Sequence, residues 1–70
     1  MTQYLNRITM SDDVAQKAYA GEFDSECDFT YININNGKES THRTTIYKAI
    51  LLAECRRDDG RYKNYEFHIG

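Results

Sequence analysis

The dipeptide Asn36-Gly37 constrains the fold of this chain more than any other local feature. Both positions tolerate positive φ, and a two-residue turn of this composition joins two antiparallel strands. The preceding residues 28–34 are rich in aromatic and β-branched side chains, which favour a strand. Residues 38–44 are polar, as expected of a return strand at an exposed sheet edge. The sequence therefore predicts a β-hairpin at its centre.

A short helix is expected before this hairpin, over residues 11–20. The Ser11 hydroxyl suits a helix start because it accepts an otherwise unpaired backbone N–H, and the following aspartates complement the positive end of the helix dipole. Gly21 is a typical helix stop. Residues 4–10 fit either a short strand or an extension of the helical pattern, and both alternatives stay open. The expected packing face of the helix is formed by Val14, Ala15, Ala18 and Tyr19.

Residues 45–57 fit two structures. A helix is favoured by an apolar stripe at helical spacing and by two arginines at its end, where positive charge is stabilised by the dipole. The competing interpretation is a long strand that enters a hairpin at Asp59-Gly60. In either case residues 61–69 form a strand, and we favour the helix before it. The helical stripe consists of Ile46, Ala49, Ile50 and Ala53.

The fold class that follows is α+β, with the order helix, strand, strand, helix, strand. We expect a single domain over residues 1–70, in which an antiparallel sheet of about three strands carries two helices on one face. At this length folding buries only about 60 to 65% of the surface of the unfolded chain, so the core is small and self-association would add burial. The expected core residues are Leu5, Ile8, Val14, Ala18, Phe23, Phe29, Ile32, Ile46, Ile50, Leu51, Ala53, Phe67 and Ile69.

The chain is expected to be cytoplasmic and to have no membrane association. Its sequence has no apolar run long enough to span a bilayer, and its first residues lack the pattern of a signal peptide. With only Cys27 and Cys55, it does not carry the disulfide framework of a small secreted protein. Two buried free thiols are therefore expected.

Carboxylates alternate with other residues between positions 22 and 28. If this segment is extended, Glu22, Asp24, Glu26 and Asp28 share one face, about 6.5 to 7 Å apart. That spacing is close to the separation of charges along a nucleic-acid backbone, so the row could mimic one. Residues 1–37 carry six acids against two bases, a net charge of −4, whereas residues 38–70 carry seven bases against five acids. The alternative is that the acids only keep an edge strand soluble.

The sequence carries no catalytic or metal-binding signature. Cys27, His42, Cys55 and His68 are residue types found in zinc sites, but no two of them are close enough in sequence to form a typical ligand pair. The glycines stand singly, without a phosphate-binding loop, and neither cysteine lies in a nucleophile motif. We therefore expect no metal, no cofactor and no enzymatic activity.

Bases and aromatic residues interleave near the C-terminus, a pattern typical of surfaces that stack on nucleotides. Nearby acids and the overall negative charge dilute the positive field that nucleic-acid binding needs. Nucleic-acid binding is therefore the second hypothesis. Its candidate residues are Arg56, Arg57, Arg61, Tyr62, Lys63 and Tyr65.

The first hypothesis is a non-catalytic module that binds a basic, nucleic-acid-binding protein through an acidic face. In its size, single domain and absence of catalytic motifs, the chain resembles the small inhibitors and accessory proteins of bacteriophages and mobile elements, including anti-CRISPR proteins; no motif carries this general resemblance. A homodimeric structural protein is the third hypothesis. The partner-binding residues of the first are Asp12, Asp13, Tyr19, Glu22, Asp24, Glu26, Asp28 and Tyr31.

Overall fold

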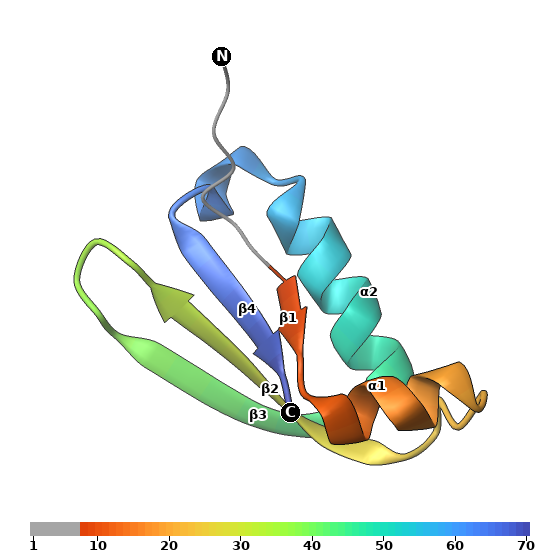
Figure 1. Ribbon diagram of the computed structural model, residues 1–70. Helices are drawn as coiled ribbons and strands as arrows, with labels where there is room; N and C mark the ends of the chain where they lie inside the picture. The colour runs from red at the N-terminus through yellow and green to blue at the C-terminus, as the bar shows by residue number, and fades with distance from the viewer. Residues whose placement is uncertain (1–7) are drawn as a thin grey trace.

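A computed structural model describes residues 8–70 and shows a small α+β domain with two α-helices and one four-stranded sheet (Figure 1). The α+β class expected from the sequence is confirmed. The elements in chain order are β1 (Ile8–Met10), α1 (Asp12–Tyr19), β2 (Glu26–Asn33), β3 (Glu39–Thr45), α2 (Ile46–Arg57), the 3-10 helix η1 (Gly60–Tyr62) and β4 (Tyr65–Ile69).

The sheet is mixed, with the strand order β1-β4-β2-β3. β2 pairs antiparallel with both β3 and β4, whereas β1 pairs parallel with β4. The expectation of about three antiparallel strands is therefore wrong in detail, because β1 adds a parallel edge strand and a new first element. The open choice for residues 4–10 is settled as a strand for Ile8–Met10, and the rest of that segment lies outside the described residues. The partner of β1 comes from the far end of the chain, so local sequence gave no sign of this pairing.

The central hairpin of β2 and β3 is confirmed, but its turn differs from the expected two-residue type. Asn33 N–H donates to Lys38 O at 2.8 Å, and Gly37 N–H donates to Asn33 O at 2.7 Å. Five residues, 34–38, lie between the two strands. Gly37 has φ 74°, but Asn36 does not have positive φ. The Asn33 and Asn36 side chains accept from the Asn35 and Lys38 backbone N–H groups, and these local bonds favour the longer loop.

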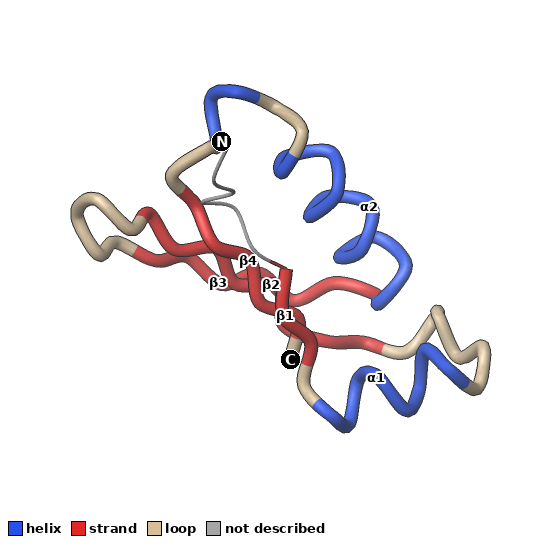
Figure 2. Tube along the Cα trace, turned by 45° about the horizontal axis from the view of Figure 1, so that its top comes forward, coloured by secondary structure: helices blue, strands red, loops and turns tan. Residues whose placement is uncertain are grey.

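Helix α1 confirms the expected start at Ser11, whose Oγ accepts from Val14 N–H at 3.3 Å. Its packing face is narrower than predicted. Val14 is buried and Ala18 half-buried, but Ala15 and Tyr19 are exposed. The reason is its position: this short helix lies at the end of the sheet near the C-terminus, so only part of the expected face has anything to pack against (Figures 1 and 2).

Residues 45–57 are confirmed as a helix rather than a strand. Thr45 caps α2 by accepting from Lys48 N–H at 3.3 Å, and α2 lies along one face of the sheet (Figure 2). The expected stripe faces that sheet, with Ile50 half-buried and the other three residues buried. The Asp59-Gly60 pair does not form a hairpin, because the Asp59 carboxylate accepts from Arg61 N–H and starts η1. β4 consequently begins at Tyr65, four residues later than predicted.

The core forms between α2, α1 and the helix-facing side of the sheet. Of the expected core, Phe23 is 40% and Leu51 43% exposed, Ile32 is only half-buried, and Leu5 lies outside the described residues. Phe23 lies in a turn and Leu51 on the outer face of α2, so neither can reach the sheet. Cys55 is exposed, contrary to expectation, whereas Cys27 is buried as expected. The buried apolar residues are Val14, Cys27, Phe29, Ile46, Ala49, Ala53, Phe67 and Ile69.

Candidate functional site

The predicted acidic row is interrupted in the structure. Glu26 and Asp28 lie on β2, but Glu22 and Asp24 lie in the turn between α1 and β2, so the four carboxylates do not share one strand face. Within β2, alternation directs Glu26 and Asp28 away from the buried Cys27 and thus away from α2. The extended segment expected over residues 22–29 is therefore wrong for its first half.

Backbone hydrogen bonds explain why the turn leaves the sheet. Ile46 N–H donates to Ser25 O at 2.9 Å, and Tyr47 N–H donates to Phe23 O at 3.0 Å. Ile46 and Tyr47 are the first residues of α2, whose N–H groups have no partner inside the helix. The turn supplies those partners, so its two acids are held at the start of α2.

Arg43 forms ion pairs with both acids that remain on β2. It lies opposite Asp28 in the β2–β3 register, and its Nη1 is 3.1 Å from Asp28 Oδ1 while its Nε is 3.4 Å from Glu26 Oε1. Hydrogen bonds to Asp28 first, and to Glu26 second, raise the pKa of the Arg43 guanidinium above its usual value. Half of the predicted row therefore forms an ion-paired group with a residue that sequence reasoning missed. The hairpin register was the signal that could have revealed it.

The other predicted acids gather around α1. Asp12 and Asp13 occupy its exposed first turn, and the turn after α1 carries Glu22 and Asp24, which are also exposed (Figure 1). Tyr19, in the last turn of α1, is 98% exposed. An exposed ion pair of 3.6 Å joins Asp13 to Lys17. We call Asp12, Asp13, Tyr19, Glu22 and Asp24 the acidic end.

Tyr31, the remaining residue of the first hypothesis, lies elsewhere. Its ring stacks on His42 with centroids 5.7 Å apart, and the Arg56 guanidinium carbon is 5.2 Å from its centroid. Arg56 also lies 5.3 Å from the Tyr62 ring, which packs edge-on against Tyr65 at 5.2 Å. The structure thus joins residues of two separate hypotheses in one group beside the end of α2. We call Tyr31, His42, Arg56, Tyr62 and Tyr65 the Arg56 cluster.

Two of the other basic residues of the nucleic-acid hypothesis form ion pairs with neighbouring aspartates. Arg57 Nε is 3.6 Å from Asp58 Oδ1, and Arg61 Nη2 is 2.9 Å from Asp59 Oδ2. The side-chain hydrogen bond from Arg61 holds the pKa of Asp59 below its usual value. Lys63 is exposed in the loop before β4. The positive field at this end is therefore weaker than the number of bases suggests.

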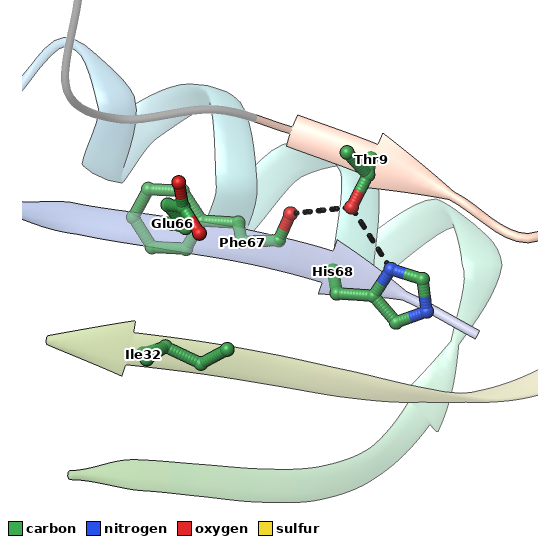
Figure 3. A pocket seen from close by; sticks show the side chains of 5 residues that line it. All are labelled: Thr9, Ile32, Glu66, Phe67 and His68. Carbon is green, nitrogen blue, oxygen red and sulfur yellow. Dashed lines mark hydrogen bonds between the residues drawn. The ribbon is translucent and has the colours of Figure 1, made fainter. Parts of the chain in front are cut away.

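A shallow depression lies on the sheet face opposite α2 (Figure 3). Its volume is 360 Å³, and it is lined by Thr9, Ile32, Glu66, Phe67 and His68. Thr9 Oγ1 donates to Phe67 O at 3.4 Å and lies 2.9 Å from His68 Nδ1. The volume is at the lower end for ligand sites, about 300 to 1,000 Å³, and no cysteine lines it.

The two thiols differ in their burial. Burial raises the pKa of Cys27, and Cys55 is exposed on α2. Within residues 8–70 neither thiol forms a hydrogen bond with His42 or His68, and no three His, Cys, Asp or Glu side chains are placed to hold a metal ion.

Comparison with protein-family models, curated proteins and solved structures found no match. No helix in the described part of the chain is long and apolar enough to cross a membrane.

Proposed function

We propose that this chain is a non-catalytic binding module that attaches through its acidic end to the basic surface of a nucleic-acid-binding protein. In this proposal it blocks or modulates its partner sterically and electrostatically, as small inhibitors and accessory proteins of phages and mobile elements do. One observation carries the proposal: Tyr19, a large aromatic residue, is 98% exposed at the end of α1. The first turn of this helix and the turn that follows it each carry two exposed carboxylates.

The physical argument rests on what Tyr19 and its neighbours do for the fold. A side chain this exposed buries almost no surface and so adds almost nothing to stability. Tyrosine is, however, among the residues that contribute most when buried at an interface, because its ring is large and has few rotatable bonds. Surrounding carboxylates would attract a basic surface over a range of about 8 Å at physiological salt. Tyr19 would then contribute binding energy at the interface, and the carboxylates would increase the rate of association with the basic partner.

Only part of the original residue set supports this proposal. Glu26 and Asp28 share their charge with Arg43, and Tyr31 belongs to the Arg56 cluster. Asp12, Asp13, Tyr19, Glu22 and Asp24 remain as the proposed partner-binding residues.

The test is capture of partners from nuclease-treated host-cell lysate by tagged protein. The E22Q/D24N variant removes two charges from the acidic end, and Y19A removes the proposed anchor. The E26Q/D28N variant is the matched control, because it removes the same number of negative charges from a pair already held by Arg43. We expect the partner to be lost with E22Q/D24N and Y19A and kept with E26Q/D28N. Equal capture by all variants, with folding intact, would refute the proposal.

A second candidate function is single-stranded nucleic-acid binding by the Arg56 cluster, favoured by the three rings, those of Phe29, Tyr31 and Tyr62, that lie 5.2 to 6.0 Å from one guanidinium. Exposed His42 and half-buried Tyr31 and Tyr62 offer ring surface on which bases could stack. Fluorescence anisotropy with a labelled oligothymidine and an oligouridine tests it. Binding that weakens with salt and is lost in Y62A would support this function; no binding at low salt would exclude it.

A further inference from the structure

We infer that two copies of this chain pair through the outer faces of their α2 helices, arranged antiparallel. The outer face is the side of α2 that points away from its own sheet, and every residue on it is exposed. This inference does not rest on the proposed function. The outer-face residues are Tyr47, Lys48, Leu51, Leu52, Glu54 and Cys55.

Apolar side chains surround α2 on both sides. Its sheet-facing side buries Ile46 and two alanines, whereas the outer face carries larger apolar groups, with Tyr47 58%, Leu51 43% and Leu52 39% exposed. Large apolar side chains that are exposed together on the second side of a helix favour its association with another surface. In this chain the sheet covers only one side of α2, and the outer face is left uncovered (Figure 2).

The charges at the two ends of α2 indicate that the partner of the outer face is a second copy of the chain. Glu22 and Asp24 lie at the start of α2, held there by the backbone bonds to its first residues. Lys48 offsets one of these two acids, so the start of α2 carries a net charge of −1. At the end of α2 four bases (Arg56, Arg57, Arg61 and Lys63) outnumber three acids (Glu54, Asp58 and Asp59), a net charge of +1. An antiparallel pair places the acidic start of one helix beside the basic end of the other, twice over, and also opposes the helix dipoles. A parallel pair would place like charges together.

The symmetry of this pair fixes which residues meet. Leu51 lies near the middle of the outer face, with Tyr47 one turn before it and Cys55 one turn after it, so the twofold axis passes close to Leu51. Leu51 of one copy then contacts Leu51 of the other. The two Cys55 residues are eight positions apart along the axis, about 12 Å, which is too far for a disulfide.

The area of the proposed dimer interface indicates how tightly the two copies should associate. A helix of 12 residues is about 18 Å long, so the paired helices alone bury less than the roughly 800 Å² per partner of a standard interface. The flanking turn and the residues after α2 must contribute the rest. We therefore expect a reversible dimer that forms with rising concentration.

Sedimentation equilibrium across a concentration series tests the dimer. The wild-type mass should rise to twice the chain mass, and L51D should stay monomeric at every concentration. I34D is the matched control, because Ile34 is 42% exposed but lies in the hairpin loop, and this variant should dimerise like wild type. A wild-type mass that remains that of one chain throughout, or an L51D mass that still doubles, would overturn the inference.

Oxidative cross-linking tests the orientation. L51C/C55S should form a disulfide-linked dimer rapidly, whereas wild-type Cys55 should not. Rapid cross-linking of wild type through Cys55 together with slow cross-linking of L51C/C55S would indicate a parallel pair and contradict the proposed arrangement. Both tests measure the chain alone, so their failure is separable from failure of the partner-capture experiment.

Discussion

Replacement of Arg56 by methionine should lower stability, because the guanidinium is held among aromatic rings rather than in water. Its central carbon lies 5.2 Å from the Tyr31 centroid, 5.3 Å from that of Tyr62 and 6.0 Å from that of Phe29. Cation–π contacts contribute about 0.5 to 1 kcal/mol at exposed sites and about 2 when desolvated. Arg56 is half-buried, so R56M, which keeps the apolar stem, should cost about 1 kcal/mol. For a domain of this size that is a fall in Tm of about 4 to 8 °C.

Urea denaturation followed by circular dichroism is the appropriate assay, since a change in midpoint without a change in slope reports stability. R57M is the control on the next residue, where the pair with Asp58 is exposed and exposed pairs contribute about 0 to 1 kcal/mol. R56M should shift the midpoint clearly more than R57M. If the two variants shift it equally, the rings do not stabilise the Arg56 charge, and our structural interpretation of the Arg56 cluster is wrong.

Two further predictions concern the backbone and the thiols. G37A should lower the free energy of unfolding by about 1 kcal/mol, because φ 74° strains any residue with a Cβ. G60A is the control: Gly60 does not have positive φ, so this variant should be neutral or slightly stabilising. Neither new Cβ would meet an atom within 4 Å, so equal effects of the two variants in urea denaturation would contradict the role of backbone strain at Gly37. Cys55 should react with iodoacetamide at neutral pH while Cys27 stays protected, since burial shields the Cys27 thiol, raises its pKa and keeps it protonated. Mass spectrometry of the modified peptides measures this, and equal labelling of both cysteines in the native state would contradict the buried position of Cys27.

Local signals predicted most elements of this fold correctly. Ser11 marked the start of α1, and helical spacing from Ile46 to Ala53 identified α2 despite the strand alternative. These signals work because capping and amphipathic packing act within a few residues. The sheet was predicted incompletely because β1 is three residues long and pairs with the other end of the chain, which no local pattern specifies.

The positions of the predicted site residues also depend on contacts between segments that are distant in the sequence. Alternation alone placed four acids on one strand, but the first residues of α2 draw the turn containing Phe23 and Ser25 away from the sheet. Arg43 pairs with Asp28 only because of the hairpin register, and Tyr31 meets Arg56 only because α2 crosses the sheet. The outer face of α2, by contrast, follows from the same helical period that predicted its inner stripe, so its exposed apolar residues were within reach of sequence reasoning.

The central claim is that the acidic end, rather than negative charge in general, binds a basic partner. The most direct measurement compares E22Q/D24N with E26Q/D28N in capture from nuclease-treated lysate, with urea denaturation used to show that both variants are folded. The two variants have the same net charge and differ only in which acids they lose. Our account predicts that E22Q/D24N loses the partner while E26Q/D28N retains it. Equal retention, or loss with E26Q/D28N alone, would contradict it.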